Sequence, residues 1–291
     1  MQRIAIVTDS HSSISPAEAA MLGVFVLPMP FDVDGQDYFE GVNLTRQQFF
    51  GYQRAGARIG TSQPAPAAVM ELWDKLLTEY DAILYMPISS GLSHSCQTAL
   101  ALAEEEPYAG RVFVVDNGRV ASPLHQSVLD ARELVAAGLS AAQCKAALEA
   151  ARGDVVIYLA VETLEHLKRG GRISSAAAAV GTLLNIKPIL RLATGKLESH
   201  QKARGMNRAC EAMLASIRAD LEGRFAQALA RGDVRLLAAG SADKVTTAKW
   251  LRQISDAFPG MPILYDDLSL GVSCHTGEGA LGVGLSVKPQ V

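Results

Sequence analysis

Short apolar runs alternate with longer amphipathic segments through the first half of the chain. The runs have the length and the β-branched content of buried strands, and they cover residues 4–7, 24–27, 82–86 and 112–115. Apolar side chains recur at helical spacing over 67–79, where Val69, Leu72 and Leu76 share one face, and a second helix is expected over 126–136. This alternation is typical of right-handed crossover units, which build a mostly parallel sheet with helices on its faces.

The pattern changes after the apolar strand predicted over 155–161. The next elements expected are a loop, a helix of small residues, an edge strand and a hairpin turn, over 168–172, 174–184, 186–192 and 193–196. The edge position is expected because Pro188 lacks the N–H that a central strand donates to its neighbour. The last elements expected are a helix, a strand, a helix and a strand, over 208–230, 234–239, 244–258 and 263–265.

A chain of 291 residues is long for one compact core, so two domains are expected. The change of pattern places the boundary near 159–165. The sequence therefore predicts an α/β protein with an N-terminal domain over 1–160, built on a mostly parallel sheet flanked by helices. A C-terminal α/β domain with antiparallel character is expected over 161–291.

Composition and charge narrow the class of protein. Apolar residues make up 49% of the chain and the formal net charge is −3, a balance that suits a soluble globular protein. No basic block is present, so nucleic acid is not an expected partner. The apolar run at the amino terminus is too short for a signal peptide, and no window approaches the ~20 apolar residues that span a bilayer, so no stable membrane insertion is expected. The four cysteines show no CxxC spacing, which favours reduced thiols and a cytoplasmic location.

Polar loops follow several of the predicted strands. Ligands of an open parallel sheet lie beyond the carboxyl ends of its strands, a rule that selects residues 9–10, 87–97 and 116–117. The 87–97 loop contains four serines, one histidine and one cysteine. A helix that begins near Ser93 would present unpaired backbone N–H groups and the positive end of its dipole to an anion. A polar or anionic group is therefore the expected ligand of this loop.

Other interpretations of the same residues stay open. A serine hydrolase could combine Ser93, His275 and Asp116, although the segment 91–95 lacks the second glycine of the G-x-S-x-G elbow. A metal site could use His94, Cys96, Cys274 and His275, although their spacings are unusual for zinc. The serines could also do no more than cap a helix. Neither a Walker A loop nor a G-x-G-x-x-G after the first strand is found.

Several short motifs occur in a fixed order along the chain. They are Ile6-Val7-Thr8-Asp9-Ser10, Thr61-Ser62-Gln63-Pro64, Ile88-Ser89-Ser90-Gly91-Leu92-Ser93, Val115-Asp116, Leu164-Glu165-His166-Leu167-Lys168-Arg169-Gly170-Gly171-Arg172-Ile173-Ser174, Ile186-Lys187-Pro188-Ile189 and His275-Thr276-Gly277. Through this ordered set, nearly the whole chain resembles the DegV family, the fatty-acid-binding proteins that serve bacterial fatty acid kinase. No single motif would be specific.

The resemblance implies a two-domain α/β protein that binds one long-chain fatty acid in the cleft between its domains, with the C-terminal domain contributing the acyl-chain pocket. It implies that this chain is not an enzyme and carries no metal and no cofactor. Catalysis then belongs to a separate, ATP-dependent, dihydroxyacetone-kinase-like subunit, which phosphorylates the presented carboxylate. By motif match, Thr61, Ser93 and His275 contact the carboxyl group, and Ser62 is included with them.

Two arginines match family positions outside the carboxyl site. Arg172, in the Gly-Gly-Arg loop, matches the position that engages the kinase, and Arg204 matches a second arginine near the cleft. The expected wall of the acyl pocket is 176–184 with Ile186, Ile189 and Leu190, because small side chains leave room; close helix packing is the alternative.

Some positions depart from the family pattern. His94-Ser95-Cys96 stands where Gly-Thr-Tyr is common, and Asn117 and Ala65 each stand where a serine is common. Glu278 replaces a proline, and its carboxylate would repel a bound fatty acid unless it points away or is paired.

Overall fold

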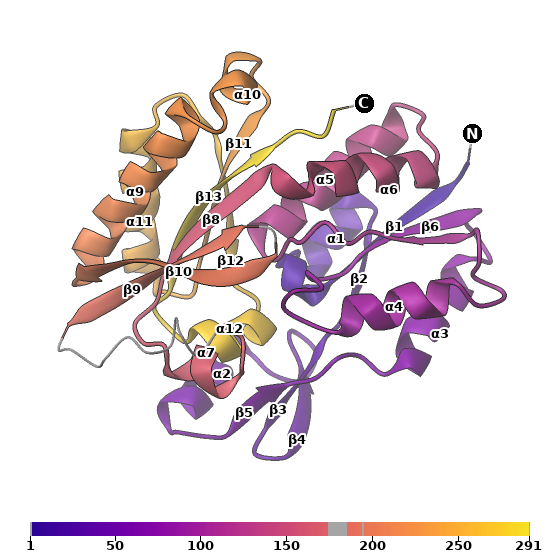
Figure 1. Ribbon diagram of the computed structural model, residues 1–291. Helices are drawn as coiled ribbons and strands as arrows, with labels where there is room; N and C mark the ends of the chain where they lie inside the picture. Colours follow the sequence, from indigo (N-terminus) through magenta and orange to yellow (C-terminus); the bar gives the residue numbers. More distant parts are fainter. Residues whose placement is uncertain (1, 174–184, 194, 291) are drawn as a thin grey trace.

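The computed structural model describes residues 2–173, 185–193 and 195–290. One large sheet lies in the N-terminal half (residues 2–154), a second lies in the C-terminal half (155–290), and a small third sheet lies near the boundary between them (Figure 1). The α/β class, the parallel N-terminal sheet and the antiparallel character of the C-terminal half are confirmed. The helix predicted over 174–184 lies outside the described residues.

The N-terminal sheet is parallel throughout. Its strands are β1 (Ile4–Asp9), β2 (Phe25–Leu27), β6 (Ala82–Met86) and β7 (Val112–Val114), in the order β2-β1-β6-β7. Apolar side chains of α1 (Pro16–Leu22), α5 (Ser122–Ala136) and α6 (Ala141–Ala150) cover one face, and those of α3 (Pro66–Leu76) and α4 (Ser95–Ala103) cover the other. Short 3-10 turns follow β1 and α6, at Ser10–Ser12 and Ala151–Gly153.

The loops after β1 and β6 lie side by side at the carboxyl edge of this sheet. The Ile88 N–H donates to the Asp9 carboxylate at 2.8 Å, and the Ser89 N–H donates to the Arg119 carbonyl at 2.9 Å. The rule for ligands of parallel sheets therefore selects a region where the segments after β1, after β6 and around Arg119 meet.

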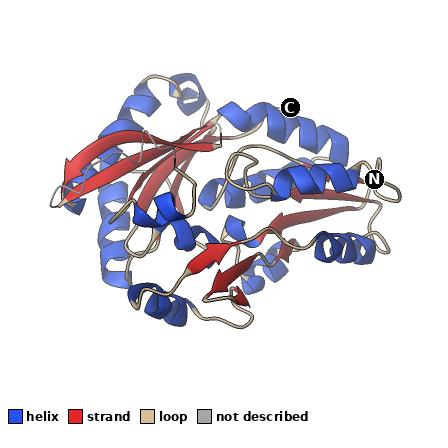
Figure 2. Ribbon diagram, turned by 60° about the horizontal axis from the view of Figure 1, so that its bottom comes forward, coloured by secondary structure: helices blue, strands red, loops and turns tan. Residues whose placement is uncertain are grey.

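The C-terminal sheet has six strands of mixed direction. They are β8 (Val155–Ala160), β9 (Ile186–Ala193), β10 (Lys196–Arg204), β11 (Val234–Gly240), β12 (Ile263–Asp267) and β13 (Leu281–Val287), in the order β10-β9-β8-β13-β11-β12. One face packs on α9 (Met206–Glu222), α10 (Ala226–Ala230) and α11 (Lys244–Ala257); α9 and α11 form the outer layer at the left of Figure 1, and α10 lies at its top. The opposite face turns toward the N-terminal half, where α7 (Glu165–Arg169), α12 (Leu270–Thr276) and α5 approach it (Figure 2).

A small antiparallel sheet, which the apolar pattern did not predict, joins the two halves. It contains β3 (Pro30–Val33), β4 (Gln36–Phe39) and β5 (Ile59–Thr61), in the order β4-β3-β5, and α2 (Arg46–Arg54) lies between β4 and β5 in the chain. Phe31, Phe49 and Phe50 pack against Leu270 and Cys274 of α12. This separate apolar cluster fixes the end of β5 against α12.

Two predictions about the C-terminal half are wrong. Strand β9 lies between β10 and β8, not at the sheet edge. The pairing of β9 with β8 ends at Ile189, opposite Ala160, and Pro188 lies one residue beyond that pair. Pro188 is tolerated because its missing N–H falls past the end of the ladder between the two strands. The single helix predicted over 208–230 is two helices, because Gly223 (φ −108°, ψ −97°) leaves the helical conformation and ends α9.

The predicted boundary near 159–165 separates β8 from the strands with which it pairs. Because β8 pairs with β9 and β13, we propose a boundary just before Val155 instead. In the described ranges, no helix combines the length and the apolar character needed to cross a bilayer.

Candidate functional site

A cavity of about 370 Å³ lies between the two halves of the molecule, and its volume is in the usual range of ligand pockets, about 300–1,000 Å³. The N-terminal half contributes His11, Thr61, Ser62, Gln63, Ile88, Leu92, Ser93, His94, Val120 and Ala121. The C-terminal half contributes Ile157, Leu159, Leu167, Arg172, Leu192, Leu197, Ala239, Leu268, Gly271, Val272, His275, Thr276 and Gly282. The cavity is thus mainly apolar, with a small set of polar groups.

The apolar floor of the cavity is the face of the C-terminal sheet that lacks α9 and α11. Along β13, Leu281, Val283 and Leu285 point to the helices, so Gly282 falls on the cavity face. A Cβ at Gly282 would lie 3.3 Å from the Leu159 side chain and 3.3 Å from the Ala239 carbonyl oxygen. The missing side chain therefore leaves bare main chain at this point of the floor.

The polar end of the cavity joins a threonine and a histidine that are far apart in the sequence. Thr61 Oγ1, at the end of β5, lies 3.0 Å from His275 Nε2, in the last turn of α12. Both side chains line the cavity. The apolar cluster between α2, the small sheet and α12 packs these elements together and so holds Thr61 close to His275.

The imidazole of His275 is held neutral. Burial is the largest cause, and the nearby charges of Arg172, His11 and His166 act in the same direction, so the pKa of His275 falls to about 4. Its Nδ1 has no hydrogen-bond partner and packs against Gly170, where a Cβ would lie 2.0 Å away. A proton on Nε2 leaves no buried N–H unpaired, so we assign that tautomer: Nε2–H donates to Thr61, and the Thr61 hydroxyl proton stays available to a ligand.

Two serines and a second histidine complete this polar end. Ser93 Oγ lies 3.0 Å from Ser95 Oγ and accepts the Ser95 N–H at 3.2 Å in the turn that precedes α4, and Ser93 lines the cavity. Ser62 lines the cavity beside Thr61 and is exposed. His11, which sequence reasoning missed, also lines the cavity, with its Nδ1 3.3 Å from an Asp9 oxygen.

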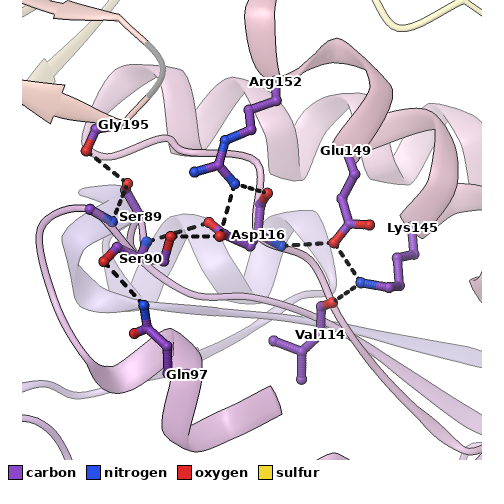
Figure 3. A network of polar contacts seen from close by, with 10 residues as sticks. Ser89, Ser90, Gln97, Val114, Asp116, Lys145, Glu149, Arg152 and Gly195 are labelled. Carbon is purple, nitrogen blue, oxygen red and sulfur yellow. Dashed lines mark hydrogen bonds and ion pairs between the residues drawn. The ribbon is translucent and has the colours of Figure 1, made fainter.

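A polar network fixes the loop that carries Ser93 (Figure 3). The Asp116 carboxylate accepts from Ser90 Oγ at 2.6 Å and pairs with Arg152 Nη1 at 2.8 Å. Burial alone would raise the pKa of Asp116, but the hydrogen bonds from Arg152 and Ser90 hold this pKa below its ordinary value. Asp116 is therefore committed to supporting the loop as a charged group.

The same loop contacts the tip of the β9–β10 hairpin. Ser89 Oγ donates to the Gly195 carbonyl at 3.0 Å, and both residues are labelled in Figure 3. Gly195 has φ +87°, and a Cβ there would lie 2.5 Å from Ser89 Oγ. Since Leu192 and Leu197 of the hairpin line the cavity, this contact fixes one of its walls.

The two arginines expected at the cleft lie in different places. Arg172 lines the cavity, where its Nε donates to the Leu92 carbonyl at 3.2 Å and its Nη1 donates to the Gly170 carbonyl at 2.5 Å. Arg204 is exposed at the end of β10, beside Ile186, and does not line the cavity. Glu278 is exposed and paired with Arg54 Nη1, at 2.7 and 2.8 Å, so its carboxylate is occupied.

The structure thus brings Thr61, Ser62, Ser93, His275 and Arg172 around one cavity. Among the described residues, His275 bonds to Thr61, and Asp116 bonds to Ser90 and Arg152, so these two side chains are paired with groups outside a Ser93–His275–Asp116 triad. In the part of the chain that the structure describes, no three His, Cys, Asp or Glu side chains gather closely enough to hold a metal ion.

The prediction of the apolar wall is wrong for the residues of that wall that the structure describes. Ile186, Ile189 and Leu190 do not line the cavity, and 176–184 lies outside the described residues. The strands that line the cavity are β8, with Ile157 and Leu159, and β9, β10, β11 and β13, with one residue each. The alternation of glycine with apolar residues at 281–285 was the available signal for the contribution of β13, because glycines on one face of a strand mark a close approach.

Comparison with known proteins gives one consistent result. A family model described as "Uncharacterised protein, DegV family" matches residues 3–288. A DegV domain-containing protein of Deinococcus radiodurans is 36% identical over 288 residues, which cover 97% of this chain and 98% of that protein. A solved structure described as fatty acid binding of a DegV family protein from Thermus thermophilus is 36% identical, with a TM-score of 0.85 and coverage of 98% of this chain and 99% of that chain. The structure of DegV, a fatty acid binding protein from Bacillus subtilis, is 26% identical, with a TM-score of 0.83 and coverage of 99% and 100%.

Proposed function

Because this chain belongs to the DegV family, we propose that it binds one long-chain fatty acid, with the acyl chain in the cavity and the carboxyl group at Thr61, Ser62, Ser93 and His275. The observation that carries the proposal is the apolar cavity of about 370 Å³ that ends at the Thr61–His275 contact. The Thermus thermophilus relative, described as binding fatty acid, supports the same ligand class.

Burial of the acyl chain supplies most of the affinity in this proposal. Each buried methylene contributes about 0.8 kcal/mol, so a chain of ~15 methylenes gains roughly 12 kcal/mol before the costs of association. A few hydrogen bonds to the carboxyl group add about 1–3 kcal/mol each. The apolar cavity therefore sets the strength of binding, and the polar end sets the orientation.

The polar end suits a carboxylate that must stay reactive. The Thr61 hydroxyl can donate to a carboxylate oxygen while the neutral His275 ring fixes the hydroxyl in place. Arg172 also lines the cavity, and its positive charge favours the ionised carboxyl group. The ligand is oriented by hydrogen bonds and by one cation, and none of these groups would react with it.

We further propose that the bound acid is the substrate of a separate, dihydroxyacetone-kinase-like subunit in the bacterial cytoplasm. A carboxylate oxygen would attack the γ-phosphorus of ATP on that subunit, the bond to the bridging oxygen would break, and ADP would leave. This chain then binds and presents the acid and contributes no catalytic residue and no cofactor. The four cysteines, all buried and free, fit a reducing compartment.

Native mass spectrometry of the purified protein tests the binding proposal. The wild-type protein should carry a mass that matches a long-chain fatty acid, and Thr61→Val should weaken palmitate binding roughly five- to tenfold through one lost hydrogen bond. Thr78→Val is the matched control, because Thr78 Oγ1 donates to Lys75 on the surface and the residue does not line the cavity. A wild-type protein that stays free of lipid after incubation with fatty acids would refute the proposal.

Acyl phosphate formation with the kinase tests the presentation step. Arg172→Ala and Arg204→Ala should each slow product formation, and Arg204→Ala should leave palmitate affinity unchanged because Arg204 does not line the cavity. Unchanged rates for both variants would show that neither arginine docks the kinase.

A further inference from the structure

A buried histidine that the proposed carboxyl contacts do not use also lines the cavity. His11 lies in the short 3-10 turn that follows β1, and the residue is only 6% exposed. Its carbonyl accepts the Ala121 N–H at 2.8 Å, so the turn is tied to the start of α5. The N-terminal half therefore fixes the place of this ring in the cavity wall.

The two ring nitrogens of His11 have different surroundings. Nδ1 is fully buried and lies 3.3 Å from the Asp9 carboxylate, which is buried as well and also accepts the Ile88 N–H. Because this negative charge attracts the ring proton, we assign the proton of the neutral ring to Nδ1. Nε2 then carries a lone pair, and no described residue donates a hydrogen bond to it. The cavity wall thus contains a hydrogen-bond acceptor that lacks a protein partner among the described residues.

Helix α12 leaves space for this ring. A Cβ at Gly271 would lie 2.6 Å from His11 Nε2 and 3.1 Å from its Cδ2, so glycine is the residue that fits beside the ring. Glycine is otherwise unfavourable in a helix, and Gly271 lines the cavity too. The Nε2 edge of His11 therefore lies where the cavity meets α12.

The same helix relates this acceptor to the carboxyl site. Gly271 and His275 are four residues apart, so they lie on one side of α12 and about 6 Å apart along its axis. Leu268 and Val272 also line the cavity, which places it along this helix. An extended acyl chain covers that distance in roughly four or five carbon–carbon bonds of ~1.5 Å each. A chain that begins at His275 and follows α12 therefore passes His11 with its first few carbons.

We propose that His11 is a specificity-determining residue that selects long-chain acids with a hydroxyl group on one of their first carbons, as in a 3-hydroxy fatty acid. The inference rests on the proposed binding of a fatty acid and narrows its substrate class. The hydroxyl group donates to Nε2, and the rest of the chain occupies the apolar part of the cavity. An unsubstituted chain covers Nε2 with methylenes and leaves it without a partner, which lowers affinity.

Calorimetric titration with three acids of equal chain length tests the proposal. The wild-type protein should bind 3-hydroxypalmitic acid about five- to tenfold more tightly than palmitic acid, through one hydrogen bond. It should show no such preference for 16-hydroxypalmitic acid, whose hydroxyl group is at the far end of the chain. His11→Phe keeps a ring and removes both nitrogens, so it should abolish the preference for the 3-hydroxy acid. His94→Phe is the matched control, because His94 lines the same cavity but is exposed to water.

Gly271→Ala tests the same subsite without removing a polar atom. Its Cβ would displace the His11 ring, since the ring is the nearest group to that position. The variant should therefore reduce the preference for 3-hydroxypalmitic acid toward that of His11→Phe. This second variant keeps the test decisive if His11→Phe does not fold.

The outcomes separate this inference from the function on which it rests. Equal wild-type affinities for palmitic and 3-hydroxypalmitic acid, or a preference that persists in His11→Phe or in Gly271→Ala, would overturn the role of His11 and leave the fatty acid proposal intact. An equal preference for 16-hydroxypalmitic acid would overturn the placement of the hydroxyl group near the carboxyl end. Failure of the wild-type protein to bind any of the three acids would overturn both proposals.

Discussion

A neutral histidine at the polar end of the cavity has consequences for stability. The imidazole loses solvent on folding and faces the positive charge of Arg172, so protonating it in the folded protein is unfavourable. In the unfolded chain the same ring titrates at its ordinary pKa near 6.5. Between the two values the unfolded state binds more protons, and stability therefore rises with pH in that window.

The pH dependence of unfolding should report this residue. The contribution of His275 is complete above about pH 6.5 and is lost as the pH falls toward about 4, at up to roughly 1.4 kcal/mol per pH unit. Urea unfolding of the wild type and of His275→Gln over this range should show a shallower slope for the variant. His94→Gln, which removes an exposed histidine at the same cavity, is the control. Parallel slopes for the wild type and His275→Gln would contradict the assignment.

At the scale of elements, the β9–β10 hairpin and the 87–97 loop close one side of the cavity together. Their contact, from Ser89 Oγ to the Gly195 carbonyl, requires a residue without Cβ at the hairpin tip. The position combines a left-handed backbone with a neighbour only 2.5 Å from the position of a Cβ. Strain and a steric clash therefore act at the same residue.

Gly195→Ala should destabilise the protein and speed the release of palmitate. Backbone strain and the contact with Ser89 should together cost about 1–3 kcal/mol. Gly232→Ala is a matched control for strain alone, because Gly232 has φ +76° with nothing within 4 Å of its Cβ position. Thermal unfolding and a stopped-flow release assay measure the two effects. Equal behaviour of the two variants would show that the hairpin contact is unimportant.

Sequence reasoning recovered the elements that carry a clear local signal. The strands at 4–7 and 82–86 are apolar runs buried on both faces, and their order fixed the parallel sheet. The small sheet was missed because its strands are three or four residues long and half exposed. Pro188 led to the wrong prediction of an edge strand. The effect of its missing N–H depends on where the pairing with the neighbouring strand ends, and the sequence does not give that position.

The candidate site was only partly predictable for the same reason. Thr61, Ser93 and His275 came from motif resemblance, and the structure brings all three to one cavity. His11 sits in a turn whose sequence gives no sign of which way the ring faces. Ile157 and Leu159 look like ordinary core residues, since a strand that borders a cavity has the same apolar pattern as one that borders a helix.

At the scale of the whole molecule, the cavity takes its walls from both halves. A ligand there replaces solvent or empty space between two otherwise separate apolar cores, so it should bind the folded state far better than the unfolded chain. Binding then adds directly to the free energy of unfolding.

Removal of bound lipid should lower the melting temperature. A ligand at a hundred times its dissociation constant adds about 2.7 kcal/mol, which corresponds to roughly 4–5 °C for a chain of 291 residues. Differential scanning calorimetry of protein stripped on a hydrophobic resin, before and after palmitate is returned, measures the shift. Identical melting curves for stripped and reloaded protein would argue against an interior ligand.

Because the main chain is bare at Gly282, every substitution at this position changes the cavity volume in the same direction. Glycine is already the smallest residue, and a Cβ there would stand within 3.3 Å of Leu159. Every replacement must therefore make the chamber shallower at that point, and none can deepen it. If the proposed acyl chain lies above β13, Gly282 leaves it the most room that any residue at this position can, and substitution of Gly282 should favour shorter or narrower ligands.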